Sequence, residues 1–138
     1  MKLNILIILL LVVSSCRLLG DEFKNKRIEA VQFIKDGKAQ NNSRLIIKGI
    51  RQMEYLSKMG DAESMYALGR IYLVGKSVEK SIASSYKWFY KAGKSCHKQS
   101  LIVLDKIFLN RKSSKYFSPL EYNNLIFSCD NINNQVIA

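Results

Sequence analysis

The sequence contains few residues that end helices and few that build catalytic sites. Its 138 residues include one proline and seven glycines, so it offers few interruptions and almost no flexible linker. One histidine and three cysteines form no cluster with metal-ligand spacing. There is also no glycine-rich phosphate loop, and no serine–lysine or paired-carboxylate signature. We therefore expect a protein that is not an enzyme and that uses no cofactor and no metal.

Acidic residues are also scarce. Asp and Glu number 11 against 22 Lys and Arg, which gives a formal net charge of +11. Such a charge favours anionic partners, namely nucleic acid, an anionic membrane surface or an acidic protein. A solvated basic surface with no dedicated partner explains the same composition, and this alternative stays open.

Apolar residues recur at helical spacing, in segments separated by glycines and N-cap residues. They make up 48% of the chain, which is typical of a protein with a folded core. The pattern predicts an all-α protein with helices near 23–36, 45–59, 61–75, 81–94 and 118–129, and a fifth helix that starts near Cys96. In the first helix, Ile28, Val31 and Ile34 form the expected inner stripe, and Gly37 the expected end. The other helix boundaries expected from the sequence are an N-cap in Asn41-Asn42-Ser43, an N-cap at Asp61, a helix end at Gly75, and a capping box in Ser118-Pro119-Leu120-Glu121.

The chain begins with an apolar segment that is typical of an export signal. Lys2 precedes the run 3–13, which as a helix would span roughly 16 Å, about half of a ~30 Å hydrocarbon core. That length is too short for a membrane span and suits a signal peptide. The run ends in Val13-Ser14-Ser15-Cys16, which resembles the lipobox of bacterial lipoproteins. An ordinary leader that happens to end near a cysteine is the alternative.

The lipobox resemblance implies where the mature chain starts and where it is held. Residues 1–15 would be the lipoprotein signal peptide, Cys16 the lipidated N-terminus, and residues 16–25 a lipid-anchored tether. The protein would then face the periplasm from a membrane of the cell envelope. Arg17 stands where an aspartate would hold a lipoprotein at the inner membrane, which favours the outer membrane.

One segment recurs, in degraded form, 36 residues later. The shift pairs Gly60 with Cys96, Met65 with Leu101, Leu68 with Leu104, and Tyr72 with Phe108. In mid-helix, Gly69 costs about 1 kcal/mol relative to alanine, so we expect it to admit a paired helix at close range. Such a pattern is typical of a helical repeat whose terminal copy has diverged.

A set of small and aromatic residues gives the central copy its character: Gly60-Asp-Ala-Glu, Ala67-Leu68-Gly69, Tyr72, Gly75, Val78, Trp88-Phe89 and Lys91-Ala92. They resemble the Sel-one-like repeat, a relative of the tetratricopeptide repeat. Residues 61–96 match best, and the flanking copies match only in their apolar skeleton. The resemblance implies a short α-solenoid of about three antiparallel helix pairs over residues 26–134, used to hold other proteins and carrying no catalytic residue.

Cys96 and Cys129 remain as a pair once Cys16 is assigned to lipidation. They stand at the start of the fifth and the end of the sixth predicted helix, which are neighbours in an antiparallel hairpin. We predict a disulfide between them, with two buried thiols as the alternative. His97 is the only histidine, and no third group in the sequence orients a Cys96–His97 pair for catalysis.

Two surfaces are candidates for partner contact. In the repeat class that the chain resembles, the first helix of each pair lines a concave groove. The residues expected there combine an aromatic side chain with cations, as interface anchors do: Tyr66, Arg70, Leu73, Ile102 and Lys106. The second surface is a basic stripe on the return helix, formed by Lys87, Lys91, Lys94 and Lys98. A solvated outer face is the alternative interpretation of the stripe.

The sequence therefore favours a protein–protein interaction module, a periplasm-facing lipoprotein that acts as an adaptor or scaffold or as an inhibitor (immunity) protein. The second hypothesis is a basic binder of lipopolysaccharide, phospholipid or nucleic acid through the lysine stripe. Export argues against nucleic acid, for which affinity would fall steeply with salt. A hydrolase is the third hypothesis, and the missing catalytic signatures argue against it.

Overall fold

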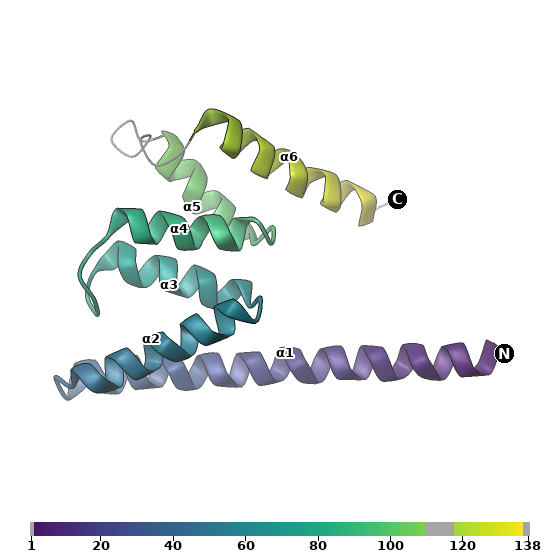
Figure 1. Ribbon diagram of the computed structural model, residues 1–138, viewed down its shortest axis with the longest axis horizontal. Coiled ribbons are helices and arrows are strands. Elements are labelled where there is room, and N and C mark those ends of the chain that lie inside the picture. The colour runs from purple at the N-terminus through teal and green to yellow at the C-terminus, as the bar shows by residue number, and fades with distance from the viewer. Residues whose placement is uncertain (1, 110–117, 137–138) are drawn as a thin grey trace. The chain divides into compact units, whose positions relative to one another are not determined.

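The computed structural model describes residues 2–109 and 118–136 (Figure 1). These residues form six α-helices and no β-strand: α1 (Lys2–Ala39), α2 (Ser43–Lys58), α3 (Ala62–Val74), α4 (Ile82–Gly93), α5 (Lys98–Leu109) and α6 (Pro119–Val136). The prediction of an all-α protein is confirmed. The chain divides into two compact units, Met1–Gln52 and Met53–Ala138, so that α2 begins in the first unit and ends in the second.

The first helix is much longer than predicted. α1 starts at Lys2 rather than near Phe23, and residues 16–25 lie within it instead of preceding it. A single glycine at position 20 costs about 1 kcal/mol, which the surrounding helix-forming residues offset. The side chain of Cys16, the predicted lipidation site, lies outside the described residues. A search of the described residues finds no helix that combines the length and the apolar character needed to cross a membrane.

In the first unit, α1 and α2 pack through small residues. Among the α1 side chains that the structure describes, the buried positions are Ala30, Ile34 and Gly37, whereas Ile28 and Val31 of the predicted stripe are 59% and 38% exposed. The stripe was therefore predicted correctly only at Ile34. A Cβ atom at the buried Gly49 of α2 would overlap the carbonyl oxygen of Ala30, so the two backbones lie in close contact there. Close contact between two helix backbones requires small side chains. α2 therefore packs on the face of α1 that carries them, and not on its most apolar face.

Gly37 does not end the first helix, which corrects another prediction. A Cβ atom at this buried position would lie 2.7 Å from Cγ1 of Ile46, so the glycine admits α2 at close range. The left-handed backbone conformation falls instead on Asn41, with φ 51°. Asn42 then caps α2, as predicted for this segment, because its Oδ1 accepts the N–H of Arg44 at 3.0 Å.

The second unit is built around α3 and α4, which form a helical hairpin (Figure 1). Asp61 caps α3, where its Oδ2 accepts the N–H of Ser64 at 3.1 Å, and Gly75 ends the helix with φ 71°. Both caps were predicted. Gly69 is buried, and a Cβ atom there would lie 2.7 Å from the ring of Phe89 on α4. The prediction that Gly69 admits the paired helix is therefore confirmed.

The core of this unit joins α4, α5 and α6. Its buried residues are Phe89, Leu104 and Leu125. Partly buried side chains from four helices surround them: Tyr66, Leu73, Tyr86, Tyr90, Leu101, Val103, Ile107 and Tyr122. α6 begins with the predicted capping box, in which Ser118 Oγ accepts the N–H of Glu121 at 3.1 Å and Glu121 Oε2 accepts the N–H of Ser118 at 3.3 Å. α6 continues beyond its predicted end near Cys129, to Val136.

The turns that precede α3 and α5 have the same geometry. Gly60 and Cys96 both have positive φ angles, of 90° and 54°. The next residue in each turn, Asp61 or His97, donates its N–H to a carbonyl five residues back, at 3.1 and 3.2 Å. The shift of 36 residues found in the sequence therefore relates two turns of the structure.

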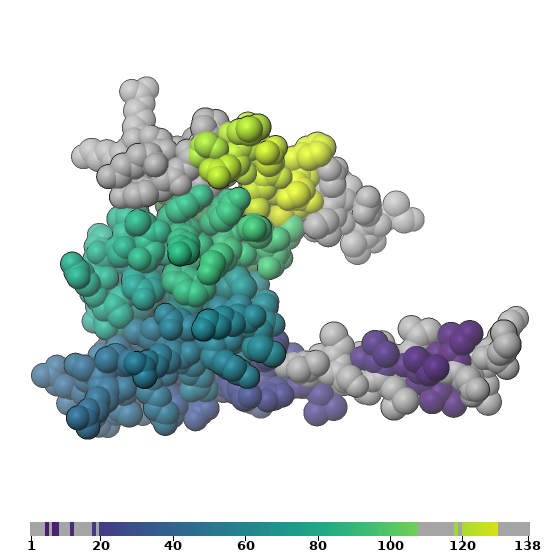
Figure 2. Space-filling view, viewed as in Figure 1, coloured from purple at the N-terminus to yellow at the C-terminus, as the bar shows by residue number. Residues whose placement is uncertain are grey.

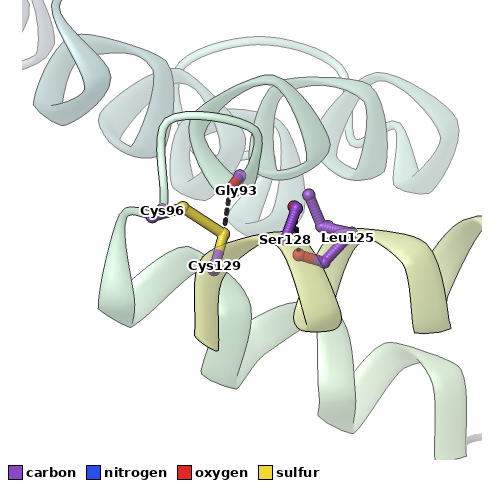
Figure 3. Close-up of a disulfide and its surroundings, with 5 residues drawn as sticks. All are labelled: Gly93, Cys96, Leu125, Ser128 and Cys129. Carbon is purple, nitrogen blue, oxygen red and sulfur yellow. Dashed lines mark hydrogen bonds between the residues drawn. A yellow bond between two sulfur atoms is a disulfide. The ribbon is translucent and has the colours of Figure 1, made fainter. Parts of the chain in front are cut away.

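The predicted disulfide joins Cys96 to Cys129, with their Cα atoms 5.3 Å apart (Figure 3). Cys96 lies in the turn between α4 and α5, and the buried Cys129 lies on α6. The Sγ atom of Cys129 is 3.5 Å from the carbonyl oxygen of Gly93. The bridge therefore fastens α6 to the end of α4.

Candidate functional site

The first candidate site is the α3–α5 face, which we define by Tyr66, Arg70, Leu73, Ile102 and Lys106. Contacts of His97 hold the first turns of α3 and α5 together. Its Nε2 lies 3.1 Å from Oε1 of Glu63, and its ring centroid lies 5.0 Å from that of Tyr66. Tyr66 and Arg70 of α3 thus have counterparts 36 residues later, Ile102 and Lys106 of α5. The N-terminal ends of these two helices are in contact through His97.

The five residues of this face differ in exposure. Tyr66 and Leu73 are partly buried and pack against the core of the second unit, and the Tyr66 ring lies 5.6 Å from that of Phe89. Arg70, Ile102 and Lys106 are exposed, with Ile102 at 48%. The Arg70 guanidinium lies 5.9 Å from the Tyr66 ring centroid. The face therefore has two exposed cations and one exposed aliphatic side chain, and beside Arg70 it has an aromatic ring that packs on the core.

His97 has hydrogen-bond partners that resemble a catalytic triad in composition. Ser100 Oγ lies 3.0 Å from Nδ1 of His97, and Glu63 lies at the other ring nitrogen. No third group for His97 is evident in the sequence, because Glu63 comes from a helix 34 residues earlier. The N–H of Ser100 also donates to Nδ1, at 3.2 Å. Since an N–H only donates, Nδ1 must accept, which leaves the ring proton on Nε2, facing Glu63.

This arrangement is a helix cap and not a nucleophilic site. Ser100 is fully buried, so no substrate reaches its hydroxyl. The same cap occurs 36 residues earlier, where Asp61 accepts from both the N–H and the Oγ of Ser64, at 3.1 and 2.5 Å. His97 is thus the counterpart of Asp61, and Ser100 the counterpart of Ser64. The 36-residue shift was the sequence signal that could have revealed the role of His97.

Replacing His97 with alanine is expected to lower the free energy of unfolding by about 1–2 kcal/mol, because α5 loses its N-cap. His97→Asn should cost less, since asparagine also caps. Asp61→Ala, in the equivalent turn, is the matched control and should cost about the same as His97→Ala. Urea unfolding monitored by circular dichroism measures all three. Equal losses for the alanine and asparagine variants of His97 would show that capping is not its contribution.

Two tyrosines of the second unit have raised pKa values. Burial, the hydrogen bond to Asp105 and the charge of that carboxylate raise the pKa of Tyr122 to about 12. Burial, followed by the charges of Glu121 and Tyr90, raises the pKa of Tyr86 well above its usual range. Both hydroxyl groups therefore stay protonated near neutral pH, and neither can act as a general base there.

The predicted lysine stripe, Lys87, Lys91, Lys94 and Lys98, extends over two helices. Lys87 and Lys91 lie on α4, Lys94 is its C-cap, and Lys98 begins α5. All four are exposed. The Nζ atom of Lys91 lies 4.5 Å from the centroid of the Trp88 ring, and that of Lys94 lies 5.9 Å from the centroid of the Tyr90 ring. The residues of α4 form part of the surface that Figure 2 shows in green.

Other features offer less for binding or chemistry. Within residues 2–109 and 118–136, no group of three His, Cys, Asp or Glu side chains is placed to hold a metal ion. A shallow pocket of about 400 Å³ is lined by side chains of α6, including Tyr122 and Phe127. Its lining residues all come from this one helix.

We compared the chain with protein-family models, with curated proteins and with solved structures, and none of them matches it. What the protein does must therefore be inferred from the geometry and chemistry of its own described residues.

Proposed function

We propose that the protein is a non-catalytic binding module, a lipid-anchored α-solenoid of the Sel-one-like type that holds one acidic protein partner on its α3–α5 face. The observation that carries the proposal is the exposed set Arg70, Ile102 and Lys106, with Arg70 beside the ring of Tyr66, which packs on Phe89. Arginine and large apolar side chains over a well-packed base are typical of interface hot spots. Two cations favour a partner that carries carboxylates.

The repeated turn supports the solenoid part of the proposal. A solenoid is built from copies of one unit, and successive copies reuse the same turn geometry. The left-handed residue, the backbone hydrogen bond and the side-chain cap all recur between Gly60–Ser64 and Cys96–Ser100. The helical hairpins that follow these turns, α3–α4 and α5–α6, would be successive copies of the repeat.

The disulfide supports the export part of the proposal independently of the leader. Disulfides persist in oxidising compartments such as the periplasm and are rare in the cytosol. Cys96 and Cys129 are bridged, which leaves Cys16, in its lipobox-like setting, for the lipid. We propose an envelope lipoprotein, with the outer membrane favoured by Arg17.

A photo-crosslinking amino acid placed at Ile102 in the native cell tests the α3–α5 face. Ile47 on α2 is the matched control, because it is also an isoleucine and is also 48% exposed. We expect one discrete protein adduct from position 102, none from position 47, and loss of the adduct when Arg70→Glu reverses a charge of the face. Mass spectrometry then identifies the partner.

The properties of the crosslinked partner separate the two roles left open. A partner enzyme whose activity falls when the purified proteins are mixed would make this protein an inhibitor, whereas a non-enzymatic envelope protein would make it an adaptor. The same adducts from positions 102 and 47, or an adduct that survives Arg70→Glu, would refute the α3–α5 face as the binding site.

A further inference from the structure

A long segment around α4 carries positive charge and no negative charge. Residues 80–104 contain five lysines, at positions 80, 87, 91, 94 and 98, and neither an aspartate nor a glutamate. The whole chain has one acidic residue for every two basic ones, so this segment is more basic than the composition requires. The excess is local, which a general bias toward lysine does not explain.

The helix places three of these lysines on one side. Successive residues of an α-helix are about 100° apart, so Lys87, Lys91 and Lys94 fall within about 60° of one another, opposite the buried Phe89 and Ala92. They span roughly 10 Å along the axis. In the described part of the chain, none of these lysines is paired with a carboxylate.

Aromatic rings lie on both sides of this lysine row. Trp88, the single tryptophan of the chain, is half-buried on one side, and Tyr90 is on the other. The Nζ atoms of Lys91 and Lys94 lie 4.5 and 5.9 Å from the centroids of these two rings, so the aliphatic part of each lysine is near an aromatic surface. Tryptophan and tyrosine favour the headgroup level of a bilayer, where lysines also reach lipid phosphates.

We propose that the outer face of α4, formed by Lys87, Trp88, Lys91 and Lys94 with Lys98 beside it, docks on the anionic phospholipid headgroups of a bilayer. Charge complementarity selects the occupant, since the face has only cations and a bilayer surface offers phosphates along its whole length. The row is exposed and has no exposed aliphatic side chain like Ile102 of the α3–α5 face, which suits a shaped protein partner. The inference does not depend on the protein partner proposed above.

The fluorescence of Trp88 tests this inference on the full chain. The protein is reconstituted in vesicles of phosphatidylcholine and in vesicles of equal parts phosphatidylcholine and phosphatidylglycerol. Comparing two compositions removes the contribution of the N-terminal segment or its lipid, which is the same in both. We expect a blue-shifted emission, and quenching by a lipid spin-labelled near its headgroup, only in the anionic vesicles. High salt should reverse both, because the Debye length falls to about 3 Å at 1 M.

A triple variant, Lys87→Gln/Lys91→Gln/Lys94→Gln, should lower the docking equilibrium constant by about a hundredfold, the combined effect of three lysines near an anionic surface. Its matched control, Lys35→Gln/Lys38→Gln/Lys58→Gln, removes the same charge from other exposed positions and should dock as the unmodified chain does. Circular dichroism shows whether both variants fold. Equal emission in the two vesicle types, or equal loss in the two triple variants, would overturn the inference, as would a shift that appears only after an acidic protein is added.

Discussion

Replacing Phe89 with alanine is expected to lower the free energy of unfolding by about 3–5 kcal/mol. Phe89 is fully buried and shares the core of the second unit with Leu104 and Leu125, while α3 approaches its ring at Gly69. Truncation removes the buried ring and leaves a cavity between packed helices. Urea unfolding measured at a single wavelength of helical circular dichroism gives the change. A loss below about 1 kcal/mol would show that the core is not centred on this ring.

Combining this variant with Gly69→Ala tests the contact between α3 and α4. In the unmodified protein an alanine Cβ would lie 2.7 Å from the Phe89 ring, and such overpacking costs about 1–3 kcal/mol, which offsets the helix preference of alanine. With Phe89→Ala the ring is absent, so Gly69→Ala should become stabilising by about 1 kcal/mol. The substitution should therefore change sign between the two backgrounds. The same effect in both would mean that Gly69 and Phe89 do not meet.

Cys129→Ala is expected to destabilise the oxidised protein by roughly 3–4 kcal/mol, which the chain-entropy model gives for a sequence separation of 33. Ser128→Ala is the control from the neighbouring position of α6, where an exposed serine bonds only to Leu125 of its own helix. It should change stability by less than about 0.5 kcal/mol. Both are compared by chemical unfolding without reductant. Equal midpoints for Cys129→Ala and the unmodified protein would exclude a stabilising bridge.

Breaking the same bridge from its other end should cost less. Cys96 has a positive φ of 54°, which is unfavourable for a residue with a Cβ atom by roughly 1–2 kcal/mol. Cys96→Gly removes the disulfide and this strain together, and it restores the residue type found in the equivalent turn at Gly60. We expect Cys96→Gly to be about 1 kcal/mol more stable than Cys129→Ala. The reverse order would contradict the left-handed conformation of Cys96.

Features that depend on neighbouring residues could be predicted from the sequence. Asp61, Gly75 and Ser118 act as caps because their partners lie within four residues of them along the chain. The Cys96–Cys129 disulfide could also be predicted, because an antiparallel hairpin brings the start of one helix close to the end of the next. Of the candidate sites, the sequence supplied the residue types of the α3–α5 face but not their exposure, because burial of Tyr66 and Leu73 depends on where α4 and α5 pack.

Features that depend on how closely two backbones approach could not be predicted. Ile28 and Val31 are more apolar than Ala30, but α2 packs where Ala30 and Gly49 leave room for it. Gly37 was mistaken for a helix end for the same reason, because a glycine in a contact and a glycine in a cap look alike in sequence. The contact between His97 and Glu63 links two helices, and no local sequence pattern predicts it.

The disulfide also determines how the chain comes apart. Of the described residues of α6, only Leu125 and Cys129 are buried, so this helix has a small share in the core. Without the bridge, α6 would separate at a lower denaturant concentration than the α3–α4 hairpin, because few of its described side chains are buried. With the bridge intact, the turn before α5 and the last helix must be lost together. Oxidation therefore couples the loss of α6 to the loss of the turn between α4 and α5, and reduction would uncouple them.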